Sequence, residues 1–170
     1  AAGWFYVNDH PDFRPSTITV CLWIRLNGPQ SNYARILVKG NDNNESYVLS
    51  TMESRKAAWV VYGTGGAHSV SSTQPLPINE WVFLAGVYDG NNIILYVDGE
   101  ADATLPGGPL TMLDSSGQVL AVGALAPDFD RRYLVANVDD VRVYNSAVSG
   151  EMIRELYTWK GGPTTTSALP

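Results

Sequence analysis

Two pairs of carboxylates stand close enough in the sequence to suggest catalysis or metal binding. Glu100 and Asp102 occupy alternate positions of a stretch with strand character, and Asp139 and Asp140 are adjacent at the start of another. Alternate positions of a strand point to one face, so Glu100 and Asp102 would lie about 6–7 Å apart. Two carboxylates so placed can divide the acid and nucleophile roles of a glycosidase. Adjacent carboxylates point to opposite faces, and their oxygens suit calcium.

The catalytic hypothesis is the weaker one. Glu100 and Asp102 follow the turn at Asp98-Gly99, where a solvated edge strand normally carries charge. The chain has no Gly-x-Ser-x-Gly, no His-Glu-x-x-His and no glycine loop leading into a helix. We therefore predict no catalytic residues and expect that this chain is not an enzyme by itself.

Composition excludes several classes of partner. The chain has 170 residues and is 45% hydrophobic, which fits one domain with a real core. Its net charge of -6 argues against nucleic acid and anionic membrane as partners. No apolar run is long enough to insert into a bilayer.

The single cysteine, Cys21, lies in the apolar stretch "TITVCLWIRL" and is predicted to be a buried, inert thiol.

Strand signals dominate the elements that must position these residues. Short β-branched and aromatic runs alternate with Gly, Asn, Asp and Pro clusters, as in antiparallel sandwiches. The predicted strands cover 16–26, 35–40, 46–52, 57–63, 80–90, 92–99, 117–125 and 137–144. Asp89-Gly90 and Asp98-Gly99 predict tight hairpin turns. One helix is expected at the end, with Ser149 as its cap.

The two ends of the chain differ in character. "AAGWFYV" already has strand character, whereas "GGPTTTSALP" has the composition of a linker. We predict one domain over 1–159 and a Gly/Pro/Thr linker over 160–170, covalently linked to other domains of a longer protein.

Four motifs in order resemble a known family. "YVNDHPDFRPSTITVCLWIRL", "EWVFLAGVYDGNNIILYVDGEA", "LAVGAL" and "NVDDVRVYNSAVSGEMIRELY" are similar to the laminin-G-like domains of the concanavalin A-like lectin/glucanase superfamily. The resemblance covers about residues 3 to 158 and implies an all-β, two-sheet antiparallel jelly-roll sandwich with one short C-terminal helix. That fold hosts glycan-binding, protein-binding and glycosidase domains, so it implies no single activity. The glycosidases of the superfamily carry a third alternating acidic residue, where this chain has Thr104.

The resemblance also implies a structural calcium ion near the start of the last strand. Strand alternation places Asp139 on the face of Val141 and Val143, which we expect to point into the core, and leaves Asp140 in solvent. An inward carboxylate needs compensation, by Ca2+ or by backbone amides of a neighbouring loop. Asn8 and Asp9 are the candidates for further calcium ligands.

Aromatic and amide side chains provide a possible sugar site. Sugar rings stack on aromatic rings, and their hydroxyls hydrogen-bond to amides and carboxylates. Trp59, Trp81 and Tyr96 have apolar neighbours and are expected in the core, and if Trp59 is buried then Tyr62 faces outward. The candidate ligand-binding residues are Tyr62, Tyr33, His68, Asn43, Asn44, Tyr133 and Trp4.

These observations predict a non-catalytic carbohydrate-binding module of a larger secreted polysaccharide-active or surface protein, with an oligo- or polysaccharide as partner. The alternative is a laminin-G-like adhesion module that binds a protein. Both hypotheses imply a secreted or cell-surface location.

Overall fold

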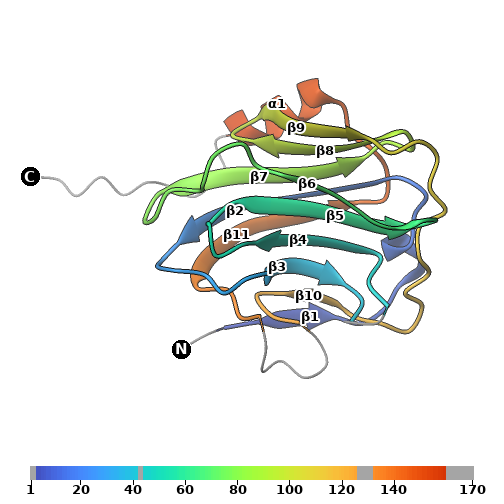
Figure 1. Cartoon of the computed structure of the whole chain (residues 1–170), viewed down its shortest axis with the longest axis horizontal. Coiled ribbons are helices and arrows are strands. Elements are labelled where there is room, and N and C mark those ends of the chain that lie inside the picture. The colour runs from blue at the N-terminus through green and yellow to red at the C-terminus, as the bar shows by residue number, and fades with distance from the viewer. Residues whose placement is uncertain (1–2, 42–43, 126–131, 160–170) are drawn as a thin grey trace, which may run out of the picture.

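The chain folds into two antiparallel sheets packed face to face. The computed structural model describes residues 3–41, 44–125 and 132–159. The six-stranded sheet has the order β1-β10-β3-β4-β5-β6 and the five-stranded sheet the order β11-β2-β7-β8-β9 (Figure 1). The predicted two-sheet jelly roll with one C-terminal helix is confirmed. The elements are β1 (Phe5–Val7), η1 (Pro11–Phe13), β2 (Ile18–Leu26), β3 (Ala34–Lys39), β4 (Tyr47–Thr51), β5 (Ala57–Gly63), β6 (Gly66–Ser71), β7 (Trp81–Tyr88), β8 (Asn92–Val97), β9 (Glu100–Pro106), β10 (Leu120–Val122), β11 (Ala136–Tyr144) and α1 (Gly150–Thr158).

The main core lies between the sheets and follows from strand alternation. In β5, Ala57, Trp59 and Val61 are buried in this core, because every second side chain of a strand points the same way. Trp59 is fully buried, and its ring N–H donates to the Val87 carbonyl at 3.1 Å. It faces Gly86 of β7, where a Cβ would overlap the indole ring.

Helix α1 covers a second apolar cluster on the outer face of the five-stranded sheet. The Ser149 hydroxyl caps the helix by accepting from the Met152 amide at 3.2 Å, as predicted. Ile153 is fully buried, and Tyr157 stacks on Trp23 with ring centroids 5.6 Å apart. Cys21 lies in the same cluster, and burial raises the pKa of its thiol to about 12. The thiol is therefore protonated at neutral pH, as expected for an inert core cysteine.

The expected core position of Trp81 is wrong, whereas Trp59 and Tyr96 are buried. On β7, Val82 and Leu84 point into the main core, so Trp81 lies on the outer side of the sheet and is partly exposed. Its cross-strand neighbour is Arg25 of β2. The unbroken apolar run that follows Trp81 in the sequence hides this alternation.

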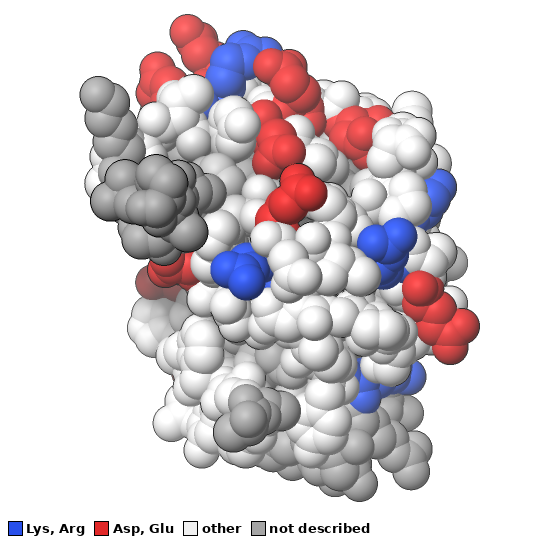
Figure 2. All heavy atoms as spheres, turned by 90° about the vertical axis from the view of Figure 1, so that its left-hand side faces the viewer, with Lys and Arg blue, Asp and Glu red and all other residues white. Residues whose placement is uncertain are grey.

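Charge is unevenly distributed over the surface. Figure 2 shows one end of the sandwich, with acidic side chains concentrated in its upper part, where α1 and β9 lie in Figure 1. Lysine and arginine groups are scattered over this end and form no continuous basic area. Among the described residues, no helix has the length and apolar character needed to cross a membrane.

Candidate functional site

Tyr62 lies on the outer face of the six-stranded sheet, opposite in direction to Trp59, as the alternation along β5 predicts. It is half-buried and packs against Val38 and Val48. Burial raises the pKa of Tyr62 to about 12, and a hydrogen bond with Glu45 acts in the same direction. The outward orientation is confirmed, but much of the ring is already covered by the protein.

A buried ion pair holds Tyr62 in place. The Arg35 guanidinium donates to the Glu45 carboxylate at 2.6 Å, and both side chains are only 4% exposed. Arg35 comes from β3, where its cross-strand neighbour is Ser50 of β4. Because a buried charge is tolerated only when it is paired, this cluster fixes the outer face of the sheet.

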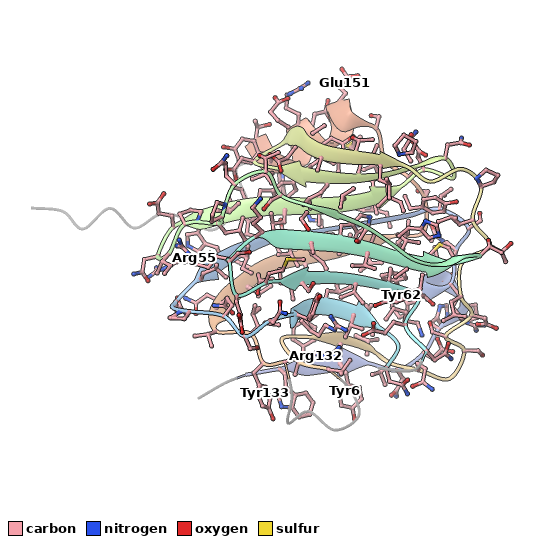
Figure 3. All side chains as sticks on the ribbon, viewed as in Figure 1. Tyr6, Arg55, Tyr62, Arg132, Tyr133 and Glu151 are labelled. Atoms are coloured by element: carbon pink, nitrogen blue, oxygen red, sulfur yellow. The ribbon has the colours of Figure 1, made fainter. Side chains whose placement is uncertain are left out.

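An exposed aromatic group on this face comes from β1 and the residue before it. Tyr6 pairs with Ala121, which lies on the outer face of β10, and Trp4 shares that direction by alternation. Trp4 is 40% exposed and Tyr6 is 49% exposed. Their ring centroids are 6.0 Å apart, and the ring planes are 21° from parallel. Tyr133 is 37% exposed, and Figure 3 shows it with Tyr6 at the same edge of the molecule, on either side of Arg132. We call Trp4, Tyr6 and Tyr133 the aromatic edge.

The other predicted ligand-binding residues are not gathered at this edge. Tyr62 lies on β5, which β10, β3 and β4 separate from β1 in the sheet. His68 of β6 is paired with Val61, so it shares the inward direction of the sheet, and its ring nitrogen lies 3.0 Å from the Thr64 carbonyl. Tyr33 is 47% exposed in the turn before β3. Asn44 closes a turn by donating to Asn41, and Asn43 lies outside the described residues.

The predicted inward direction of Asp139 is wrong. The pairing of β11 with β2 shifts register between Asp139 and Arg142, and Asp140 has φ 50°. This bulge adds a residue, so Val138 and Val141 both point into the core while Asp139 points outward and is exposed.

The predicted solvation of Asp140 also needs correction. Asp140 is half-buried and binds the Arg142 guanidinium through two hydrogen bonds, of 2.8 and 2.7 Å. Its backbone amide donates to Asp139 at 2.8 Å. Both carboxylates thus have partners within the bulge, and the amide that binds Asp139 belongs to the next residue rather than to a neighbouring loop.

Asp9 is bound to a buried ammonium group. The Lys39 ammonium, fully buried, donates to Asp9 at 2.8 Å and to the Ser115 carbonyl at 3.0 Å. The second Asp9 oxygen accepts from the Gly117 amide at 2.8 Å. The hydrogen bond from Lys39 is the main reason that the pKa of Asp9 is lowered.

Asp139, Asn8 and Asp9 therefore do not fit one calcium site. Asp139 lies on the outer face of the five-stranded sheet, whereas Asp9 is bound to the end of β3 in the other sheet. No group of three acidic, histidine or cysteine side chains suited to a metal ion occurs within the described ranges. Calcium binding stays a prediction of the sequence.

Thermal melting tests that prediction. An ion that binds only the folded chain at 100 times its dissociation constant adds about 2.7 kcal/mol to the free energy of unfolding. If Asp139 contributes to a calcium site, calcium raises the melting temperature by several degrees, and both chelator and Asp139→Asn abolish the rise. Equal melting temperatures with calcium and with chelator would contradict calcium binding.

Glu100 and Asp102 are each bound to a separate partner. Glu100 forms two hydrogen bonds with Arg154 of α1, at 3.0 and 2.9 Å, and these lower its pKa. Asp102 accepts from the amide and the hydroxyl of Thr73, both at 2.6 Å. The pairing of β9 with β8 also shifts register at this point, which interrupts the alternation that would align the two carboxylates. The arrangement gives neither group the free position that a glycosidase acid or nucleophile needs.

A family comparison agrees with this architecture. The family model described as "Concanavalin A-like lectin/glucanases superfamily" matches residues 1–154. A search of curated proteins found no match.

Solved structures share the fold at low sequence identity. A SAP-like pentraxin from Limulus polyphemus has a TM-score of 0.67 at 14% identity, covering 85% of this chain and 70% of that one. Domain 4 of AbnA, a GH43 extracellular arabinanase from Geobacillus stearothermophilus in complex with arabinotriose, has a TM-score of 0.65 at 15% identity, covering 84% and 67%. Botulinum neurotoxin type C, whose cell entry depends on two ganglioside molecules, has a TM-score of 0.68 at 16% identity, covering 91% of this chain but 39% of that one. At these identities the likeness concerns the fold alone.

Proposed function

The chain belongs to the concanavalin A-like lectin/glucanases superfamily, and on that basis we propose that it is a non-catalytic carbohydrate-binding module. It acts within a larger secreted polysaccharide-active or surface protein. Its ligand is an oligo- or polysaccharide, with the aromatic edge as the binding surface.

The aromatic edge is the observation that carries this proposal. Exposed aromatic rings are costly to leave in water, and a sugar ring covers such a ring with its C–H face. Trp4, just before the edge strand β1, and Tyr6 within it present nearly parallel rings, which suits a chain of sugar units better than a single deeply bound one. The absence of free catalytic carboxylates at Glu100 and Asp102 supports binding without hydrolysis.

Two structural neighbours support a saccharide as ligand. The arabinanase domain was solved with arabinotriose, and the neurotoxin depends on gangliosides. Both are parts of larger proteins, as we propose for this chain. Its net charge of -6 further favours an uncharged partner over a polyanion.

Alanine variants of the aromatic edge test the proposal. We expect Trp4→Ala and Tyr6→Ala each to weaken saccharide binding by about 1 kcal/mol or more, because each removes a stacking surface. Wild-type affinity should lie in the range of about −4 to −8 kcal/mol, which is millimolar to micromolar. The measurement is calorimetric titration with oligosaccharides, after thermal melting has shown that the variants are folded.

Trp159→Ala is the matched control, since Trp159 is 56% exposed but lies at the end of α1 over Arg142. It should bind saccharides as the wild type does. If Trp4→Ala and Tyr6→Ala both bind normally, the aromatic edge is the wrong surface. Tyr62, Tyr33, His68 and Asn44 are then the next positions to vary.

A protein-binding adhesion module is the second candidate function. One observation favours it: Phe5 and Val7, on the other side of β1, are 51% and 45% exposed, and sugars do not require apolar groups on both sides of a strand. Absence of any saccharide binding, together with a defined extracellular protein partner whose binding Phe5→Ala abolishes, would favour adhesion.

A further inference from the structure

A cavity of about 460 Å3 is lined by residues 14–16, Ser46 and residues 110–114. This volume is within the range of small-molecule sites. Polar and apolar groups share its lining: Arg14, Ser16 and Asp114 on the polar side, and Pro15, Leu110 and Met112 on the apolar side. None of these residues belongs to the aromatic edge.

The wall formed by residues 110–113 is held by hydrogen bonds to both sheets. The Leu110 amide donates to the Tyr88 hydroxyl at 2.7 Å, and the Leu113 amide donates to the Tyr62 carbonyl at 2.8 Å. The cavity is therefore formed before any ligand arrives, which lowers the entropic cost of binding.

The guanidinium N–H groups of Arg14 donate no hydrogen bond to the rest of the described chain. Its side chain is 29% exposed, and its nitrogens come no closer than 3.6 Å to Asp9 and 3.6 Å to Asp114. These separations are too long for hydrogen bonds, and no other hydrogen bond of its guanidinium occurs in the part of the chain that the structure describes. Asp9 already accepts from Lys39 and Gly117, so it does not need Arg14.

Asp114 supplies the complementary acceptor. One of its oxygens accepts from the Ser116 amide at 2.9 Å, and its side chain is 70% exposed. A guanidinium only donates and a carboxylate only accepts, so neither can bind a second group of its own kind. A sugar hydroxyl does both. Two adjacent hydroxyls would accept from Arg14 and donate to Asp114.

We propose that this cavity binds one uncharged sugar residue of a glycan, with adjacent hydroxyls bridging Arg14 and Asp114 and its C–H face against Leu110 and Met112. The inference rests on the proposed function and adds a second contact site, distinct from the aromatic edge. The opposite charges of Arg14 and Asp114 cancel, and Lys39 neutralises Asp9, so the cavity favours neither acidic nor amino sugars.

Titration of cellotriose, xylotriose and arabinotriose into the folded chain tests this site. Arg14→Met keeps the length of the side chain and removes its donors. Asp114→Asn keeps an acceptor for the Ser116 amide and removes the charge. Each variant should weaken binding by at least about tenfold, as expected for the loss of a hydrogen bond to a charged group. The double variant should lose less than the product of the two single effects, because both groups hold the same sugar.

Arg154→Met and Glu100→Gln are the controls, since they remove an exposed ion pair on the α1 side and should not alter binding. If wild type binds a trisaccharide and both cavity variants bind equally well, the cavity is not a sugar site, although the proposed function stands. If wild type binds none of the three sugars, the proposed function fails and the cavity proposal with it. Loss of binding in the cavity variants but not in the controls supports the proposal.

Discussion

Replacing Trp59 by alanine is expected to lower the free energy of unfolding by about 3–5 kcal/mol. The indole is fully buried between the two sheets, so its removal leaves a large cavity. The Val87 carbonyl also loses the hydrogen bond that it accepts from the ring. Chemical denaturation with a two-state fit measures this change, with an unchanged slope as the sign that the comparison is valid.

Gly86→Ala disrupts the same contact, between Trp59 and Gly86, from the other sheet. A Cβ at Gly86 would overlap the Trp59 ring, so either the ring or β7 must shift. Overpacking of this kind costs about 1–3 kcal/mol. Val60→Ala is the matched control, because Val60 is the next residue of β5 but lies half-buried on the outer face. A Trp59→Ala variant as stable as Val60→Ala would show that the two sheets do not meet at this point.

The fold was largely predictable from the sequence because inward and outward side chains alternate along most of its strands. Along β5 the alternation places Trp59 inside and Tyr62 outside, and the structure confirms both directions. The Ser149 cap and the turns at Gly90 and Gly99 depend on neighbouring residues alone, and they are confirmed too. The family resemblance drawn from four motifs is also confirmed.

Alternation fails where a bulge interrupts it. The bulge at Asp139–Arg142 reverses the direction of Asp139, and no residue of that stretch signals it, since Asp140 takes its positive φ without being glycine. Strand β6 was missed because "GAHSVS" contains small and polar residues with little strand preference, and its pairing with β5 supplies the stability.

The candidate sites depend on contacts that local sequence does not encode. Trp4 was predicted as a ligand-binding residue, but its alignment with Tyr6 depends on the pairing of β1 with β10, more than a hundred residues away. Arg14 and Asp114 are likewise a hundred positions apart in the chain. Only the closed sandwich brings such residues to one end, so the ligand-binding surfaces required the structure.

Asp9→Ala is expected to be the second strongly destabilising change, at about 3–5 kcal/mol. The Lys39 ammonium is fully buried, and Asp9 is its only carboxylate partner within the described residues. Removing that partner leaves a buried charge with carbonyls alone, which is the costly way to break a buried pair. Asp9 also ties the 115–118 loop through Gly117, so the variant loosens the wall beside the cavity.

The dependence on pH follows from the lowered pKa of Asp9. In the unfolded chain the pKa of an aspartate is about 3.9. Because the pKa of Asp9 is lower in the folded chain, its ion pair adds to the free energy of unfolding. This contribution is complete above the unfolded pKa and is lost as the pH falls through the folded pKa. We therefore expect wild type to lose stability on acidification below about pH 4, and Asp9→Asn to lose less over the same interval. Denaturation curves at a series of acidic pH values measure the difference.

A second substitution separates the buried charge from the other effects of Asp9→Ala. Lys39→Met in the Asp9→Ala background removes the ammonium that has lost its carboxylate partner and fills its space with an apolar side chain of similar length. An apolar replacement of a buried ion pair is often neutral or stabilising, so the double variant should be more stable than Asp9→Ala alone. If the double variant is instead less stable, the ammonium is adequately solvated by the Ser115 and Gln118 carbonyls. The cost of Asp9→Ala would then come from the lost acceptor of the Gly117 amide, and Asp9→Asn, which keeps an acceptor there, should be much less destabilising than Asp9→Ala.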